Sequence, residues 1–208
     1  MSQILWILDP GHGGLINGEY QTPGKRSPKW DDEITLYEGE FNRGVVNRII
    51  ERCVPAGIRY YHVSPEMEDT SLPERVARAN KWNNKGPCIY LSVHANAGGG
   101  KGWEIYTSKG QTKSDKIATI FYEKMREEFA ELPSKHFRRD YRDGDPDKEM
   151  NFYVLKHTKM PAVLTENFFM DNNQECREFL MNRSSRSRIA DAHFRAMLHI
   201  EQTYQSFV

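Results

Sequence analysis

Two apolar segments of this chain, residues 4–8 and 88–93, each lead into a histidine that is followed by glycines. The first segment is followed by Asp-Pro-Gly-His-Gly-Gly, which contains His12, and the second by His-Ala-Asn-Ala-Gly-Gly-Gly, which begins with His94. A short apolar run that stops at glycine or proline is typical of a buried strand. The pattern therefore predicts two buried strands with an imidazole at each carboxyl end, where open α/β sheets bind their ligands.

Segments with strand and helix patterns alternate along the chain, which indicates an α/β fold. From Glu38 to Cys53 apolar residues recur at three- and four-residue steps, and Ser71 with Pro73 marks another helix start. The alternation predicts one domain over residues 1–208, with a twisted, mostly parallel sheet of about five to seven strands and helices on both faces. The expected strands span residues 4–8, 58–63, 88–93, 103–107, 153–155 and 162–165; the expected helices span 38–53, 71–79, 114–129, 174–181 and 187–204; loops are expected at 15–34 and 140–148.

Composition argues against several classes of function. The 208 residues contain 29 Lys+Arg and 29 Asp+Glu, so net charge favours neither nucleic acid nor a membrane surface. No segment reaches the ~18 apolar residues of a membrane span, and the first residues lack the basic start of a signal peptide. The scattered Cys53, Cys88 and Cys176 are typical of buried thiols in a reduced compartment, not of disulfides or a cysteine zinc site.

Two carboxylates join the histidines at the ends of expected elements. Glu38 opens the first long helix, and Glu166 directly follows the last expected strand. Because the carboxyl ends of parallel strands lie along one edge, these side chains can converge there with His12 and His94. Two histidines and a carboxylate are a common ligand set of catalytic zinc, and a further carboxylate could act as general base and proton donor.

Most of these residues also have a purely structural explanation. The turn at His12 could bind phosphate, but it has neither G-x-G-x-x-G nor the Lys-Ser/Thr of a P-loop; a turn histidine without a role also stays open. Glu38 could complement the helix dipole, an effect of about 0.3–1 kcal/mol, and Glu166 could do the same before a following helix. His94 is harder to explain, because its turn belongs to neither a core nor a helix face. No H-E-x-x-H motif supports zinc independently.

In chain order, these segments resemble the catalytic domain of the zinc-dependent N-acetylmuramoyl-L-alanine amidases, the amidase type 3 family. The resemblance covers almost the whole chain. The matching pieces are Leu8-Asp9-Pro10-Gly11-His12-Gly13-Gly14, Glu38 with Phe41-Asn42, Ser71-Leu72 with Arg75 and Ala79-Asn80, Leu91-Ser92-Val93-His94-Ala95-Asn96-Ala97, Tyr153-Val154-Leu155 and Pro161-Ala162-Val163-Leu164-Thr165-Glu166.

The resemblance implies a phosphorylase/hydrolase-like fold and a peptidoglycan hydrolase that cleaves the amide between N-acetylmuramic acid and L-alanine of the stem peptide. It implies that His12, Glu38 and His94 bind Zn²⁺ and that Glu166 is the catalytic glutamate. Glu40 is the alternative carboxylate ligand; Glu38 is preferred because it keeps the family's spacing to the residues that follow it.

A bare domain without a signal peptide looks similar to a phage or prophage endolysin, which is made in the cytoplasm and acts on the cell wall. We also expect a monomer. Two alternatives stay open. One is a zinc peptidase or carboxypeptidase that cleaves another amide of the stem peptide. The other is a catalytically silent wall-binding module, which is disfavoured because all four site residues are present.

Several positions depart from the family pattern or have an open role. Phe168 stands where the family usually has glycine, and Ser64-Pro65 replaces a usual Thr-Arg. Asp9 and Asn96 are candidates to hold the ligand imidazoles, with roles in turns as the alternative.

The acidic loop 140–148 lacks the glycine and glutamate of an EF-hand, so we expect a solvated loop or a contact to the cationic end of the stem peptide. The aromatic residues Trp30, Trp103 and Phe169 could form a platform for sugar or peptide, or belong to the core.

Overall fold

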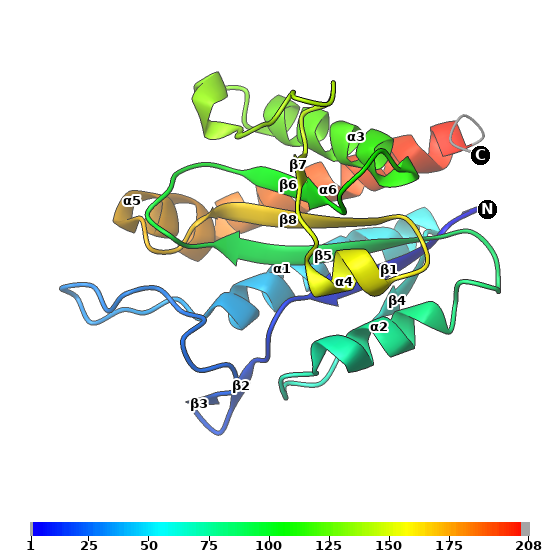
Figure 1. Ribbon diagram of the computed structural model, residues 1–208. Helices are drawn as coiled ribbons and strands as arrows, with labels where there is room; N and C mark the ends of the chain where they lie inside the picture. The colour runs from blue at the N-terminus through cyan, green and yellow to red at the C-terminus, as the bar shows by residue number, and fades with distance from the viewer. Residues whose placement is uncertain (1, 205–208) are drawn as a thin grey trace.

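A six-stranded sheet in the order β4-β1-β5-β8-β6-β7 forms the centre of the structure, a computed structural model that describes residues 2–204 (Figure 1). The four strands β4, β1, β5 and β8 are parallel, whereas β6 lies antiparallel to β8 and β7 runs parallel to β6. The predicted mostly parallel sheet is therefore confirmed. Its strands are β1 (Leu5–Pro10), β4 (Arg59–His62), β5 (Cys88–Asn96), β6 (Glu104–Thr107), β7 (Lys148–Glu149) and β8 (Ala162–Phe169).

Helices cover both faces of the sheet, as the alternation of segments predicted. The long helices α1, α3 and α6 pack on one face, and the shorter α2 and α4 pack on the other. Strand residues alternate between the two cores: in β1, Trp6 and Leu8 belong to the first and Ile7 to the second. The helices are α1 (Glu38–Ala56), α2 (Leu72–Asn80), α3 (Lys113–Glu128), α4 (Tyr153–His157), α5 (Asn173–Glu175) and α6 (Arg183–Thr203), with a 3₁₀ turn at Ser134–His136 and a π-helical turn at Cys176–Met181.

The start of α2 follows its sequence signals. The Ser71 hydroxyl accepts a hydrogen bond from the backbone N–H of Glu74 at 3.4 Å, and Pro73 occupies the first turn. This cap fixes where α2 begins, and α2 carries Arg75 into the space below the end of β1.

The prediction of a strand at residues 153–155 is wrong, because this segment belongs to helix α4. Both positions beside β8 are occupied, by β5 and β6, so another strand cannot pair there. The side chains of Val154 and Leu155 instead join the apolar cluster that contains Val76 and Ala79 of α2. Three apolar residues in a row do not distinguish a short helix from a strand.

Some element boundaries also differ from the prediction. The expected loop 15–34 contains a hairpin, and the loop 140–148 ends in β7. Helix α6 begins at Arg183, four residues early, because the Asn182 side chain caps it by accepting two backbone N–H groups at 2.9 and 3.1 Å. The hairpin strands are β2 (Leu15–Ile16) and β3 (Glu19–Tyr20).

A bulge in β8 places Phe168 in a backbone conformation that favours glycine. The register between β5 and β8 shifts just after Glu166, and the φ angle of Phe168 is 59°. The Phe168 ring stacks on Phe179 with centroids 4.0 Å apart and meets Phe129 edge-on at 5.7 Å. Aromatic packing thus offsets the backbone strain at the position where the family usually has glycine.

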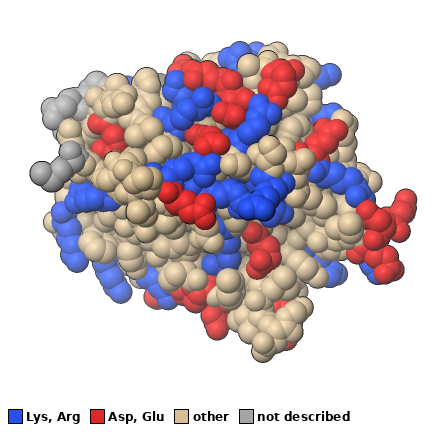
Figure 2. All heavy atoms as spheres, turned by 180° about the vertical axis from the view of Figure 1, so that it is seen from behind, with Lys and Arg blue, Asp and Glu red and all other residues tan. Residues whose placement is uncertain are grey.

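The face covered by α1 and α6 carries interleaved positive and negative side chains (Figure 2). Arg52 of α1 pairs with Asp191 of α6 at 2.5 Å, and Arg188 pairs with Glu128 at 3.0 Å. Such partly exposed pairs contribute about 0–1 kcal/mol each. Ion pairs therefore match part of the charge on this face.

Two further properties of the described residues concern the membrane and the thiols. Within residues 2–204, no helix combines the length and apolar character needed to cross a bilayer. The cysteines Cys53, Cys88 and Cys176 are buried and unpaired, as predicted.

A buried neutral histidine should make the fold sensitive to acid. His193 of α6 is fully buried; its Nδ1 donates to the Ile189 carbonyl at 2.7 Å, so its Nε2 accepts from the Thr165 hydroxyl at 3.0 Å. Burial lowers the pKa of His193 to about 4, below the ordinary value of about 6.5. Because the unfolded chain takes up this proton first as pH falls, we expect the full stabilisation above pH ~6.5 and a loss of ~3 kcal/mol by pH ~4.

Urea denaturation at several pH values would measure this loss of the free energy of unfolding. In a His193→Gln variant, the free energy of unfolding should fall less steeply as pH is lowered over the same range. An unchanged slope in that variant would assign the acid sensitivity to other groups.

Candidate metal centre

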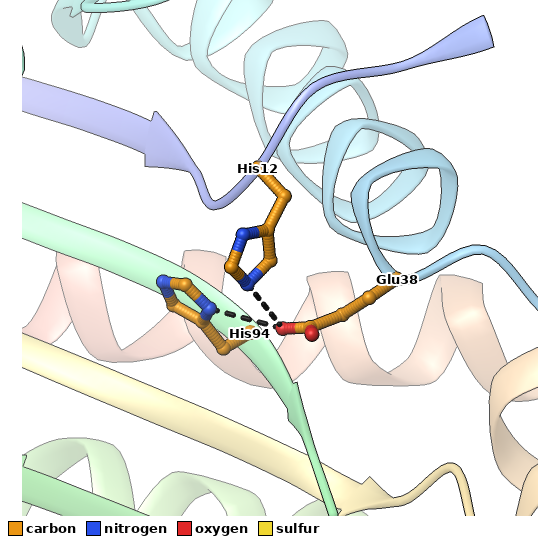
Figure 3. Close-up of side chains that lie close together, drawn as sticks. All are labelled: His12, Glu38 and His94. Carbon is orange, nitrogen blue, oxygen red and sulfur yellow. Dashed lines mark hydrogen bonds and ion pairs between the residues drawn. The ribbon is translucent and has the colours of Figure 1, made fainter. Parts of the chain in front are cut away.

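His12, Glu38 and His94 lie together at the carboxyl edge of the sheet, where β1, α1 and β5 meet (Figure 3). The Oε1 atom of Glu38 is 3.2 Å from Nε2 of His12 and 3.0 Å from Nδ1 of His94. The two imidazole rings meet edge to face, with their centroids 5.0 Å apart. One ligand atom from each residue lies within 4.8 Å of the other two, so a single ion can contact all three.

The turn that carries His12 is held in a left-handed backbone conformation by side chains of α1 and α2. The φ angle of His12 is 68°, which is uncommon for a residue other than glycine. The three consecutive carbonyl groups that end with His12 accept hydrogen bonds from Arg75, Asn42 and Arg43 at 2.8, 2.9 and 3.1 Å. These contacts fix the direction of the imidazole before any ligand arrives.

The lack of a side chain at Gly11 makes room for the second histidine. A Cβ atom on Gly11 would lie 2.0 Å from Cε1 of His94, so any larger residue would displace the ring. The glycine-rich character of the turn therefore serves the packing of two imidazoles, which is a different use from a phosphate-binding loop.

Glu38 and Glu40, the two candidate carboxylate ligands, have separate roles in the first turn of α1. Glu38 is 2% exposed and contacts both histidines. Glu40 instead accepts a hydrogen bond from the backbone N–H of Leu15 at 2.9 Å. The geometry therefore assigns Glu38 to the cluster and Glu40 to the support of the β2–β3 hairpin.

The charges of this cluster are strongly linked. Burial alone would raise the pKa of Glu38, but hydrogen bonds from His12 and His94 hold it well below its ordinary range. Burial lowers the pKa of His94, yet the Glu38 carboxylate outweighs this and raises it. Glu38 therefore stays ionised at neutral pH, the form in which a carboxylate binds a metal.

Glu166 lies on β8 as the register partner of His94 on β5. Side chains of partner residues on neighbouring strands point to the same face of a sheet, here the face of α2 and α4. The Oε2 atom of Glu166 is buried and has no hydrogen-bond partner among residues 2–204. Burial raises the pKa of Glu166 to about 8, with Glu38 and Glu104 adding to the effect and His94 opposing it.

All four residues line one pocket of about 710 Å³. Helices α2 and α4 contribute Leu72 and Tyr153 to its wall, and these side chains are 50% and 38% exposed. The segment before α1 contributes Lys25. The pocket thus combines polar and charged residues, with Lys25 and Arg75 as its cations, and apolar groups, the usual composition of a ligand site.

Asp9, one of the two candidates to hold a ligand imidazole, binds Arg75 instead. The other oxygen of Asp9 accepts hydrogen bonds from Tyr90 at 2.6 Å and Ser92 at 2.9 Å. Burial would raise the pKa of Asp9, but Arg75 and these two donors lower it. Through Arg75, this buried network supports the turn of His12 from below.

Asn96, the other candidate, donates to Glu104 at 2.6 Å and not to a histidine. Glu104 is the register partner of Glu166 on the side opposite to His94, and it forms ion pairs with Arg138 and Lys148. Asn96 therefore belongs to a charged network that flanks Glu166.

The aromatic residues singled out in the sequence have packing roles. Trp103 is fully buried and its indole N–H donates to Asn167 at 2.9 Å, while Phe169 is 3% exposed. Trp30 is partly buried against the main core. None of the three lines the pocket, so the interpretation as core residues is the correct one.

Neutralising Asp9 should destabilise the protein far more than neutralising Asp69, although both carboxylates face Arg75. Asp9→Asn leaves the buried guanidinium of Arg75 without its main partner, a loss that typically costs about 3–5 kcal/mol. Asp69 is 35% exposed and lies 3.5 Å from Arg75, so Asp69→Asn should cost at most ~1 kcal/mol. Urea denaturation of both variants measures the difference; equal losses would show that the Asp9–Arg75 pair has no special weight.

The cluster of His12, Glu38 and His94 fits a zinc ion by its donor set. Two imidazole nitrogens and one carboxylate oxygen are typical of catalytic zinc, which keeps a further position open. Beside them Glu166 offers a buried oxygen that lacks a partner. Among residues 2–204, this is the only group of three potential ligands at such short mutual distances.

The sheet carries a His-Glu-His cluster at its carboxyl edge and a further carboxylate on the next strand. This arrangement defines a candidate metal-dependent hydrolase. Residues 7–199 match the family model described as N-acetylmuramoyl-L-alanine amidase, of type 3. The chain belongs to this family, as the resemblance of its motifs implied.

Two curated relatives show the level of similarity. The N-acetylmuramoyl-L-alanine amidase CwlM of Bacillus licheniformis is 32% identical over 187 residues, which cover 90% of this chain and 64% of the relative. The endolysin of Bacillus phage SPP1 is 29% identical over 206 residues, which cover 96% of this chain and 66% of the relative. The chain thus spans about two thirds of the length of these proteins.

Solved structures show the same fold at lower identity. The amidase AmiC2 of Nostoc punctiforme has a TM-score of 0.73 and 20% identity, with 96% of this chain and 98% of that chain covered. An N-acetylmuramoyl-L-alanine amidase of Clostridium difficile 630 has a TM-score of 0.73 and 21% identity, with 97% of this chain and 98% of that chain covered.

Proposed function

We propose that this protein is a zinc-dependent N-acetylmuramoyl-L-alanine amidase, which hydrolyses the amide bond between N-acetylmuramic acid and L-alanine in peptidoglycan. The observation that carries the proposal is the convergence of His12, Glu38 and His94 with Glu166 in one pocket. Membership of the family and the names of the relatives, a bacterial amidase and a phage endolysin, support it.

His12, Glu38 and His94 would hold the zinc ion. When bound, zinc supplies Lewis acidity that activates water and polarises the amide carbonyl. The residues of the chain orient these ligands. Arg75 of α2, together with Asn42 and Arg43 of α1, holds the His12 turn. The pairing of β5 with β8 holds His94 beside Glu166.

Glu166 is the proton carrier in this proposal. Its carboxylate takes a proton from the attacking water and then donates it to the departing amine of L-alanine, because an unprotonated amide nitrogen leaves poorly. Burial raises the pKa of this carboxyl group, which favours the protonated form that donates to the departing amine. Its unpartnered oxygen leaves it free to form these transient hydrogen bonds.

The substrate would enter from the side of α2 and α4. There Leu72 and Tyr153 present apolar surface to the lactyl and sugar groups, and Lys25 offers a cation to the carboxylates of the stem peptide. All four site residues come from one chain, which supports action as a monomer. We propose that residues 1–208 form the catalytic domain and that it acts on the cell wall.

A defined muramyl peptide tests the proposal. After a chelator has removed the bound metal, the protein should not hydrolyse the amide between the lactyl group and L-alanine in N-acetylmuramyl-L-alanyl-D-isoglutamine. Adding back about one zinc ion per chain should restore hydrolysis. Unchanged hydrolysis in the presence of the chelator would rule out the zinc-dependent mechanism.

A further inference from the structure

Tyr153, the first residue of α4, presents an aromatic ring to the pocket that holds the His-Glu-His cluster. Its side chain lines this pocket and remains exposed, whereas Trp103 and Phe169 are buried away from it. A large ring that stays exposed beside a cavity is typical of a residue that contacts a ligand. The pocket therefore contains an aromatic platform, a role for which the sequence indicated other aromatic residues.

A second ring supports the platform. Tyr153 and His157 lie one helical turn apart on α4, and their rings pack with centroids 4.3 Å apart at an angle of 36°. His157 itself does not line the pocket. The imidazole thus covers part of one face of the Tyr153 ring, and the exposed surface of the ring is left on the side of the pocket.

Helix α4 is short, but its contacts hold it in place. Val154 and Leu155 are buried in the cluster that includes residues of α2, and Figure 1 shows both helices on the same face of the sheet. The Asn80 side chain at the end of α2 donates to the His157 carbonyl at 3.0 Å, and the Thr158 hydroxyl donates to the Val154 carbonyl at 2.7 Å. The platform is therefore preorganised, which reduces the entropic cost of binding a ligand.

Two parts of the pocket wall differ in charge. At the starts of α2 and α4, Leu72 and Tyr153 provide apolar surface. The segment before α1 provides Lys25, the exposed cation of the pocket, because the guanidinium of Arg75 is buried and paired with Asp9. In the proposed substrate the sugar is uncharged, since the lactyl carboxyl group is part of the amide, whereas the stem peptide carries carboxylates. Charge complementarity therefore places the peptide toward Lys25 and the sugar toward Tyr153.

We infer that Tyr153 binds the pyranose ring of N-acetylmuramic acid by stacking and gives the protein a preference for substrates that retain this sugar. The inference rests on the proposed amidase function. The C–H groups on one face of a pyranose carry partial positive charge and pack on the negative face of an aromatic ring. The sugar is joined to the scissile amide through the short lactyl group, so it lies within the same pocket. The hydroxyl of Ser71, in the same wall, is available to the polar edge of the sugar.

The kinetics of two substrates test the inference. One is N-acetylmuramyl-L-alanyl-D-isoglutamine, and the other is N-lactyl-L-alanyl-D-isoglutamine, which has the same scissile amide but no sugar. Tyr153→Ala should raise KM for the muramyl substrate about tenfold with kcat unchanged, because stacking stabilises the ground state and the transition state alike. KM for the lactyl substrate should not change. Tyr153→Phe keeps the ring and should behave as the wild type with both substrates.

Tyr141→Ala is the matched control, because Tyr141 is an exposed aromatic residue that does not line the pocket. Its KM values should equal those of the wild type. An equal rise of KM for both substrates in Tyr153→Ala, or no rise for either, would overturn the inference.

Failure of the amidase proposal gives a different result, since the wild type would then hydrolyse neither compound. Calorimetric titration with the same two compounds tests the platform in that case. Tighter binding of the muramyl compound by the wild type and Tyr153→Phe, lost in Tyr153→Ala, supports the inference. Equal affinity of the wild type for both compounds overturns it.

Discussion

Replacing Glu166 with glutamine should reduce the turnover of peptidoglycan hydrolysis by about 10²–10⁴-fold, the usual contribution of general acid–base catalysis. The amide keeps the shape of the side chain but can neither take the proton of water nor deliver it to the leaving amine. Zinc content should not change, because His12, Glu38 and His94 are untouched. The melting temperature should stay the same or rise, because the buried carboxylate has an oxygen that no hydrogen bond satisfies.

A purely structural role for Glu166 predicts the reverse, a lower melting temperature with turnover nearly intact. Glu175→Gln is a useful control. Glu175 is 1% exposed, but its carboxylate accepts from the backbone N–H groups of Gly102 and Phe169, both at 3.0 Å, and it does not line the pocket. Because a glutamine oxygen can accept both of these bonds, this control should keep its turnover and most of its stability. Near-wild-type hydrolysis by Glu166→Gln would contradict the proposed mechanism.

Replacing Glu38 with glutamine should weaken zinc binding by more than about 100-fold, beyond the 10–100-fold that loss of an outer partner typically costs. The change removes the only carboxylate of the ligand cluster and with it the negative charge that both histidines face. Turnover should fall in parallel at limiting zinc. Competition with a chromophoric chelator measures the affinity directly.

Glu40→Gln is the matched control for this substitution, in the same helical turn. Glu40 contacts the Leu15 backbone, and a glutamine oxygen can accept the same hydrogen bond. This variant should bind zinc as the wild type does. Loss of zinc from Glu40→Gln with full retention in Glu38→Gln would exchange the two assignments.

Much of the candidate site was predictable because its residues stand at the ends of elements. His12, His94 and Glu166 each follow an apolar run, and parallel pairing of β1, β5 and β8 brings the ends of these runs to one edge. Local sequence patterns are enough for that inference, although β5 and β8 continue past the predicted ends to Asn96 and Phe169.

The supports of the site could not be predicted in the same way. Arg75, Arg43 and Asn42 bind successive carbonyl groups of the His12 turn, and backbone acceptors leave no mark in the sequence. Asp9 and Asn96 are close in sequence to the ligands, but their partners come from α2 and β6, which only the tertiary structure brings near. The same holds for Phe168, whose strained backbone is offset by rings distant in sequence.

The most direct test of the amidase proposal is mass spectrometry of intact peptidoglycan after digestion with the zinc-loaded protein. The account predicts free lactyl ends on N-acetylmuramic acid and an equal amount of stem peptides with new L-alanine amino termini. Stem peptides that are shortened while still attached to N-acetylmuramic acid would contradict it, and would identify the protein as a peptidase acting on another amide of the same polymer.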